Sequence, residues 1–172
     1  GEWTRQELMQ LPKGHWSLPF FEDPIAAEAL KGAQLGDLAD IRDGATTGEA
    51  YQIRAFIQDR SPKADDIKII NTGLIDPHRT LWGHRPIRYP GFKALRPVIS
   101  NQDLISINSN RLRQANQAKT LVAGMGKRIE AVAVPPGVLC GKSAVQILPQ
   151  KGICTFAIAA WLNSDWACGF YR

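Results

Sequence analysis

Three short apolar runs in the second half of the chain predict the centre of the fold. Residues 120–123, 129–135 and 144–148 are rich in Val, Ile and Ala, and Gly and Pro lie between them. Runs of this length bounded by Gly and Pro are typical of β-strands joined by tight turns. We therefore expect a central sheet, with cations on and beside its loops at Lys119, Lys127, Arg128 and Lys142.

Further elements are predicted on both sides of this sheet. Strands are expected over residues 35–42, 51–57 and 67–71, and helices near residues 24–31, 106–118 and 153–168. The helix at 106–118 has little apolar content and should face solvent. Together these elements predict an α+β fold, with a twisted, mixed or mainly antiparallel sheet and a few packed helices.

The last predicted helix contains an apolar stripe. Residues at three- and four-residue spacing should face the core: Ile153, Phe156, Ala157, Ala160, Trp161 and Ser164. We expect this stripe to be packing surface, with no cofactor implied.

The segment Asp43-Gly-Ala-Thr-Thr-Gly48 is a candidate binding loop. Its two glycines flank two hydroxyl groups, so exposed amides and the Thr46 and Thr47 side chains can meet phosphate or base edges. The segment lacks the Lys and the spacing of a Walker loop, and it is not GxGxxG. The alternative is a plain hairpin turn.

Charge is distributed unevenly along the chain, whose formal net charge is +5. Residues 79–142 contain eleven Lys and Arg against two acidic residues, whereas residues 1–78 contain eight against thirteen. So basic a section is the expected footprint of a protein that binds a phosphate backbone. The alternative is a solvated surface that the acidic first half balances after folding.

Within the basic section, Arg79, Arg85 and Arg88 are interleaved with Trp82 and Tyr89. Cations beside aromatic rings suit phosphate contact and base stacking together. The alternative is that the aromatic rings pack inward and the arginines are simply exposed.

Composition limits the other classes of protein. A hydrophobic content of 44% and a charged content of 22% fit one globular domain. Cys140, Cys154 and Cys168 form no CxxC pair and no ligand spacing with the histidines, which argues against a zinc site and fits a reducing cytoplasm. No segment reaches the length of a membrane span.

The order of these features resembles the TaqI-like C-terminal specificity domain of adenine-specific DNA methyltransferases, which is related to the target recognition domains of type I restriction specificity subunits. The resemblance covers residues 35–172. It rests on five segments in order: LGDLADIRDGATTG at 35–48, IKIINTGLI at 67–75, KTLVAGMGKRIEAVAVPPG at 119–137, KSAVQILP at 142–149 and FAIAAWLNSDWACGFYR at 156–172.

The resemblance implies a domain that holds duplex DNA opposite an upstream methyltransferase domain of the same chain, in a restriction–modification system of prokaryotic defence. In the family, that catalytic domain binds S-adenosylmethionine and carries an Asn-Pro-Pro-aromatic motif beside the flipped adenine. Val134-Pro-Pro-Gly137 has neither the Asn nor the aromatic residue. We therefore expect a non-catalytic C-terminal piece of a larger enzyme, with a connecting strap at 1–34 and the recognition domain at 35–172.

The expected DNA contacts fall into two groups. Lys119, Lys127, Arg128 and Lys142, with the neighbouring Ser143, would contact the DNA backbone. Thr46, Thr47, Arg79, Arg85 and Arg88 would reach base edges.

Two other functions are consistent with the residues. Asp43, Asp66 and Lys68 are the residue types of a magnesium-dependent nuclease site, in which two carboxylates hold the ion and a lysine polarises the water. A protein-interaction domain whose basic surface meets an acidic partner is the other alternative.

Overall fold

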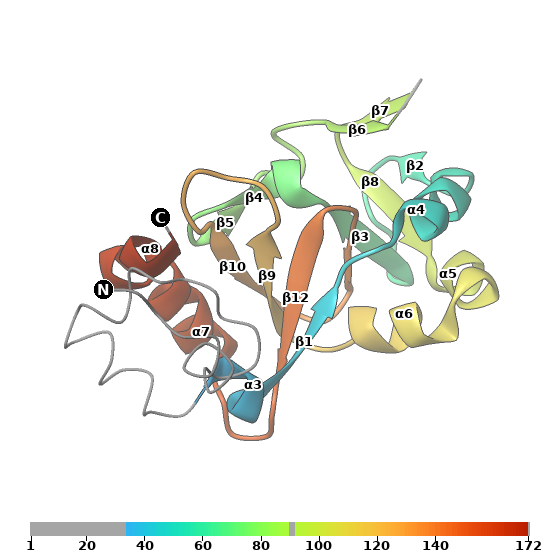
Figure 1. Cartoon of the computed structure of the whole chain (residues 1–172). Helices are drawn as coiled ribbons and strands as arrows, with labels where there is room; N and C mark the ends of the chain where they lie inside the picture. The colour runs from blue at the N-terminus through green and yellow to red at the C-terminus, as the bar shows by residue number, and fades with distance from the viewer. Residues whose placement is uncertain (1–33, 90–91, 172) are drawn as a thin grey trace, which may run out of the picture. The chain divides into compact units, whose positions relative to one another are not determined.

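The fold is α+β and is built on two four-stranded sheets. The computed structural model describes residues 34–89 and 92–171 (Figure 1). The helix expected near residues 24–31 and most of the expected strap at 1–34 lie outside these residues. In the described part of the chain, the sheets are accompanied by two small two-stranded hairpins.

The first sheet is antiparallel throughout and has the strand order β1-β12-β9-β10. Its strands are β1 (Ala39–Asp43), β12 (Ala144–Pro149), β9 (Lys119–Ala123) and β10 (Ala131–Val134). The expected runs at 120–123 and 144–148 are therefore confirmed as strands, and the run at 129–135 is confirmed over the shorter range of β10. The strand predicted over residues 35–42 is only partly confirmed. Its second half is β1, whereas its first half forms the short helix α3 (Leu35–Leu38).

The second sheet is mixed and has the order β11-β3-β8-β2, with β11 parallel to β3. Its strands are β11 (Val138–Cys140), β3 (Asp66–Ile70), β8 (Pro97–Ser100) and β2 (Gln58–Asp59). The prediction at 67–71 is confirmed as β3, whereas β11 and β8 were not predicted. The two hairpins pair β4 (Ile75–Asp76) with β5 (Arg79–Thr80), and β6 (Ile87–Tyr89) with β7 (Phe92–Ala94). A short 3-10 helix, Thr72–Leu74, precedes β4.

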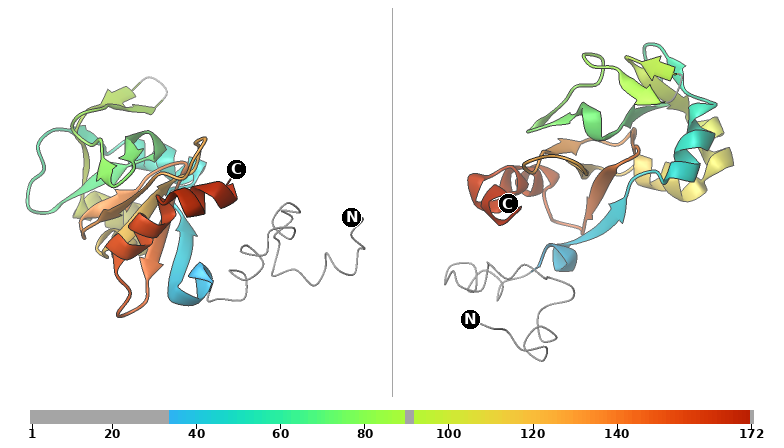
Figure 2. Two further views of the ribbon diagram at one scale, coloured as in Figure 1. Left: turned by 90° about the vertical axis from the view of Figure 1, so that its left-hand side faces the viewer. Right: turned by 45° about the horizontal axis from the view of Figure 1, so that its top comes forward.

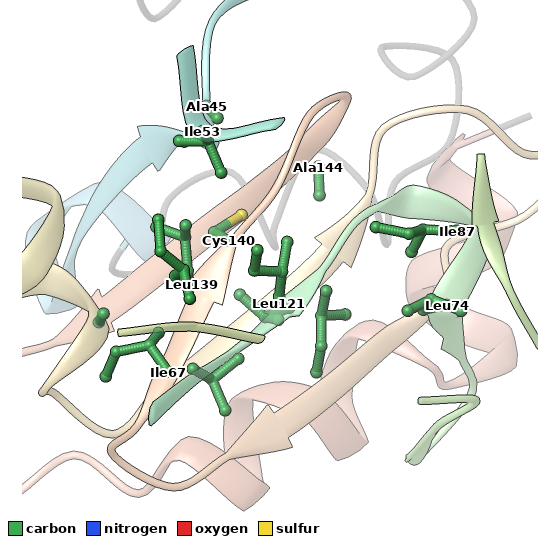
Figure 3. Close-up of a cluster of buried hydrophobic side chains, with 14 of the residues drawn as sticks. Ala45, Ile53, Ile67, Leu74, Ile87, Leu121, Leu139, Cys140 and Ala144 are labelled. Atoms are coloured by element: carbon green, nitrogen blue, oxygen red, sulfur yellow. The ribbon is translucent and has the colours of Figure 1, made fainter. Parts of the chain in front are cut away.

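The main core lies between the two sheets. Ile69 and Ile99 of the second sheet are fully buried in one cluster with Leu121 of the first. Figure 3 shows Leu121 of β9 beside Leu139 of β11 in this cluster. On the opposite face of the first sheet, α7 (Thr155–Leu162) packs Ile158 and Leu162 against Ala131 and Ile147. The first sheet is thus covered on both faces, which explains its nearly continuous apolar runs.

The predicted strand at 51–57 is wrong, because this segment belongs to helix α4 (Thr47–Arg54). Thr46 is the N-cap of α4: its side chain accepts a hydrogen bond from the Glu49 amide, and the Glu49 side chain accepts one from the Thr46 amide. This capping box stabilises a helix start. The buried residues Ala50 and Ile53 then follow helical spacing, three positions apart.

The other two predicted helices are each divided in two. Residues 106–118 fall in α5 (Asn101–Ile107) and α6 (Ser109–Ala115), which meet at Asn108. The Asn108 side chain accepts hydrogen bonds from the amides of Asn110 and Arg111 and so starts α6. Residues 153–168 fall in α7 and α8 (Asp165–Tyr171), which are separated at Asn163.

Within α7 the predicted stripe names the wrong face, although Ile153, just before the helix, packs against the core as expected. Phe156 is 73% exposed and Trp161 48%, whereas Ile158, Ala159 and Leu162 are buried. Because α7 is apolar on all sides, periodicity alone does not select its inner face. Asn163 helps to select it: its amide accepts from the Ala131 amide at 2.9 Å and donates to the Ala131 carbonyl at 2.7 Å.

No helix among the described residues is both long enough and apolar enough to cross a membrane.

The inner face of α7 yields a stability prediction. We expect Leu162→Ala to lower the free energy of unfolding by about 2–4 kcal/mol, because it leaves a cavity against the first sheet. Phe156→Ala on the outer face of the same helix should change it by less than about 0.5 kcal/mol. Denaturant unfolding of both variants measures the difference; equal losses would contradict the assigned inner face.

Candidate nucleic-acid interface

One edge of the first sheet gathers the loops that the sequence singled out. Asp43, the last residue of β1, lies opposite Val145, and Ala144, the first residue of β12, lies opposite Ala123 at the end of β9. The β9–β10 turn follows Ala123 directly. The end of β1, the start of β12 and the β9–β10 turn therefore share one edge, the upper one in Figure 1. We call it the loop edge.

A cavity of about 440 Å³ opens at the loop edge. It brings together four of the expected DNA-contact residues, which come from two distant parts of the chain: Thr46, Thr47, Lys142 and Ser143. The rest of its lining consists of Asp43, Gly44, Ala45, Gly124, Met125, Ala144 and Val145.

Two glycines allow the backbone segments around the cavity to approach closely. A Cβ atom on Gly44 would overlap the carbonyl oxygen of Gly141 and lie 2.9 Å from that of Ala144. A Cβ atom on Gly124 would overlap the carbonyl oxygen of Ser143. Gly48 differs, because its Cβ atom would meet nothing within 4 Å. Gly44 is thus required by packing, whereas no steric contact requires Gly48.

The two threonines of the loop have different roles. The alternative of a hairpin turn is wrong, since the segment runs from β1 into α4. The Thr46 oxygen is engaged in the capping box at 3.3 Å from the Glu49 nitrogen. The Thr47 hydroxyl, like the Ser143 hydroxyl and the Lys142 ammonium, makes no hydrogen bond to a described residue. These three groups are therefore available to a ligand.

Ser143 has a strained backbone at the cavity wall. Its φ of 59° lies in the left-handed region, which costs a non-glycine residue about 1–2 kcal/mol. Its carbonyl accepts a hydrogen bond from the Gly124 amide at 3.0 Å. This bond ties the β11–β12 turn to the β9–β10 turn and holds the strained conformation. Strain of this kind is common at binding sites.

The exposed cations of the loop edge are Lys142, Lys127 and Arg128, and none forms an ion pair with a described residue. Lys127 and Arg128 lie in the β9–β10 turn that also supplies Gly124 and Met125 to the cavity. Asp43 is the acidic residue of the lining, so the cavity carries both signs of charge.

The expected arginines lie away from the cavity. Arg79 forms an ion pair with Asp76 at 2.7 Å in the β4–β5 hairpin, and Arg85 donates to the Gly73 carbonyl at 3.3 Å. Arg88 is exposed on the β6–β7 hairpin, which lies at the periphery in both views of Figure 2. None of the three lines the cavity.

Trp82 bears out the alternative in which an aromatic ring of this section packs inward. Its Nε1 donates to the Pro97 carbonyl at 3.1 Å, and the Lys68 ammonium lies 4.9 Å from its ring centroid.

Lys119 is not a surface cation, so its expected contact with phosphate is wrong. It is completely buried, and its ammonium donates to the carbonyls of Gln114 and Gln117 at 2.7 Å and of Ala115 at 3.3 Å. These carbonyls lie at the end of α6, where a cation is favoured. Burial lowers the pKa of Lys119 from 10.5 to about 8, and burial raises the pKa of the nearby Cys140 thiol to about 12.

The residues of the nuclease alternative are dispersed. Asp66 forms a two-pronged ion pair with Arg60 and accepts the Lys63 amide at 2.6 Å, and the hydrogen bonds from Arg60 are the main cause of its lowered pKa. Lys68 lies over Trp82. Asp43 belongs to the other sheet. In the described part of the chain, no group of three His, Cys, Asp or Glu side chains is placed to hold a metal ion.

Sequence reasoning missed Met125 as a lining residue and Arg111 as a neighbour of the loop, and it included Asp43 in the loop without expecting it to contact DNA. Arg111 was assigned to a solvent-facing helix, but its side chain is only 12% exposed and pairs with Glu49. The pattern Thr46-x-x-Glu49 is a capping box and predicts the start of α4. The partner of Glu49 is 62 residues away and has no local signal.

No protein-family model matches the chain, and a search of curated proteins finds no match.

The buried Lys119 predicts a pH-dependent stability. Between pH 8 and 10.5 the unfolded chain holds this proton and the folded chain does not, so wild-type stability rises with pH in this window. Relative to Lys119→Met, the wild-type free energy of unfolding should rise by up to about 3 kcal/mol across this window. Below the lower end of the window the difference between the two proteins should not change with pH. Unfolding of both proteins across this range measures it. If the difference in unfolding free energy between the two proteins does not change with pH, the pKa of Lys119 is not lowered. The hydrogen bonds to the three carbonyls would then offset the loss of hydration of the ammonium group.

Proposed function

We propose that the chain recognises duplex DNA as the target recognition domain of an adenine-specific DNA methyltransferase or a related restriction–modification enzyme. One observation carries the proposal. Two of the segments in which we expected DNA contacts, at residues 43–47 and 142–143, line one cavity although about 100 residues separate them. The methyltransferase domain and its S-adenosylmethionine belong to the proposed parent enzyme.

The unpaired groups of the cavity suit one phosphate of a DNA backbone. Lys142 supplies a positive charge, and Thr47 and Ser143 supply hydroxyl donors. The amides of Thr47 and Gly48, at the start of α4, make no hydrogen bond within the described residues. A helix start favours a negatively charged group. The carboxylate of Asp43 opposes an anion, so we assign the phosphate to the side of the cavity formed by these donors.

The neighbouring β9–β10 turn extends this surface. Lys127 and Arg128 are exposed there and lie outside every ion pair of the described residues. Several unpaired cations along one edge match the repeated phosphates of a duplex. Met125 of the same turn lines the cavity, is 70% exposed and offers an apolar contact to a base or sugar.

Arg79, Arg85 and Arg88 do not line the cavity, so the cavity gives no reason to place them in the DNA interface. In the proposed complex they would serve a second, more distant contact. Arg88 is the best placed of the three, because it is exposed, whereas Arg79 is engaged in an ion pair and Arg85 in a hydrogen bond to the Gly73 carbonyl.

A first test separates phosphate contacts from general charge. We expect Lys127→Ala, Arg128→Ala and Lys142→Ala each to weaken binding to all duplexes alike and to reduce the slope of log K against log salt by about 0.9. Lys151→Ala is the matched control, because Lys151 follows β12 at the opposite end of the sheet. Fluorescence anisotropy of labelled duplexes over a salt series measures both quantities.

Three results of this titration would count against the proposal. The first is an equal loss of duplex affinity in the Lys151 variant. The second is a change in sequence preference while the salt slope stays constant. The third is that excess unlabelled DNA fails to displace the labelled duplex. The last result, combined with tight binding to acidic polypeptides, would favour the protein-interaction alternative.

A second test uses the loop itself. Gly48→Ala should leave stability unchanged or raise it by up to about 1 kcal/mol, since Ala is the better helix former and the added methyl meets open space. If DNA approaches the start of α4, the same methyl should lower duplex affinity about tenfold, or ~1.4 kcal/mol.

Two threonine variants complete this test. Thr47→Val should behave like Gly48→Ala in binding while stability stays within about 0.5 kcal/mol. Thr46→Val loses the helix cap and should cost about 1 kcal/mol of stability. Calorimetric melting and anisotropy separate the two effects. Unchanged affinity in both Gly48→Ala and Thr47→Val would remove the start of α4 from the interface.

A further inference from the structure

One buried arginine connects the segments that form the cavity. Arg111 of α6 is 12% exposed, and each of its five guanidinium N–H groups has an acceptor. Nη1 donates to the Asp43 carbonyl at 2.9 Å and Nη2 to the Gly44 carbonyl at 2.8 Å. Nε and Nη2 donate to the two Glu49 carboxylate oxygens at 3.1 and 2.8 Å, and Nη1 also donates to the Gln114 side chain at 3.2 Å.

Glu49 transmits this contact to the start of α4. Its carboxylate accepts the Thr46 amide and the Asn108 side chain, each at 2.8 Å, in addition to Arg111. The Arg111 hydrogen bonds are the main cause that lowers the pKa of Glu49 to about 2. The carboxylate therefore stays charged at neutral pH, although it is only 17% exposed.

Gln114 connects Arg111 to β12 by hydrogen bonds. Its side-chain oxygen accepts from Arg111 and also from the buried Gln146 of β12, at 2.9 Å. Gln146 lies three residues after Ser143 on the strand that carries the other side of the cavity. The same polar network thus reaches the end of β1, the start of α4 and the beginning of β12.

We propose that Arg111 is a positioning residue of the cavity: it holds the Asp43–Gly44 backbone and, through Glu49, the first turn of α4, and so sets Thr47 against Lys142 and Ser143. The inference rests on the proposed DNA recognition. Arg111 does not contact DNA in this proposal, because its donors are already occupied. Its function requires the forked guanidinium, since one ammonium cannot reach two carbonyls and both carboxylate oxygens.

Arg111→Lys is the variant that tests this. It keeps the charge beside Glu49, so the chain should fold, but it loses the forked contacts. Arg113→Lys is the matched control, because Arg113 is exposed on the same helix. Two readouts are measured on the whole chain: amide hydrogen exchange of peptides covering residues 43–50, and duplex affinity over a salt series.

In Arg111→Lys we expect exchange at residues 43–50 to become at least about tenfold faster while β3 and β8 are unchanged. Duplex affinity should fall about tenfold with the salt slope unchanged, since no phosphate contact is lost. Arg113→Lys should alter neither readout.

Each opposite result decides the matter. Unchanged exchange at residues 43–50 overturns the positioning role, whatever happens to DNA binding. Faster exchange with unchanged duplex affinity would show that the position of residues 43–50 does not matter for binding. A salt slope reduced by about 0.9 would show that Arg111 itself contacts a phosphate. If the wild-type chain binds no duplex, the proposed function fails, and the exchange measurement alone still decides whether Arg111 positions the cavity.

Discussion

The close approach of two backbone segments at Gly44, the end of β1 and the β11–β12 turn, is the constraint on which the loop edge depends. The Gly44 amide donates to the Ala144 carbonyl at 2.8 Å, and the next amide, of Ala45, donates to the Cys140 carbonyl at 3.1 Å. There is no room for a side chain at this point. Because the end of β1 is fixed against the β11–β12 turn, α4 must start beside Lys142 and Ser143. The cavity forms because the end of β1 meets the β11–β12 turn at this point.

Two inward-facing cations satisfy backbone carbonyls, one at the loop edge and one at the end of α6. Arg111 covers the carbonyls of Asp43 and Gly44, and Lys119 covers three carbonyls at the end of α6. Buried polar groups without partners are costly, so a long cationic side chain with several donors is an effective solution. Both residues belong to the basic section of the chain, yet both support the fold. The basic character of residues 79–142 therefore overstates the charge that is available to a ligand.

The remaining cations divide by position. Those at the loop edge follow strand ends or lie in turns, where no neighbouring carboxylate among the described residues pairs with them. Arg79 and Arg60 are paired with Asp76 and Asp66 within their own segments. The Arg79–Asp76 pair is exposed and contributes little to stability, whereas Asp66 is almost fully buried in its pair with Arg60. For both arginines, the pairing reduces the charge that is available to a ligand. An unpaired cation can neutralise a phosphate without first losing a partner.

The sequence by itself determined the α+β class and the strands β3, β9, β10 and β12, because short runs rich in Val, Ile and Ala between turn residues favour strands. It also contained the capping box at Thr46 and Glu49, a local signal that outweighs the apparent strand pattern at residues 51–57. Only the tertiary structure decided which face of α7 is inner, since both faces are apolar and the choice depends on the contact of Asn163 with β10. Likewise, Arg111 is turned inward by partners more than 60 residues away, at Asp43, Gly44 and Glu49. The carbonyls that hold Lys119 are near it in sequence, but its burial requires the packing of β9 inside the first sheet. Periodicity tells which residues share a face, whereas the partners of Glu49 and Arg111 were chosen by the packing of segments far apart in the chain.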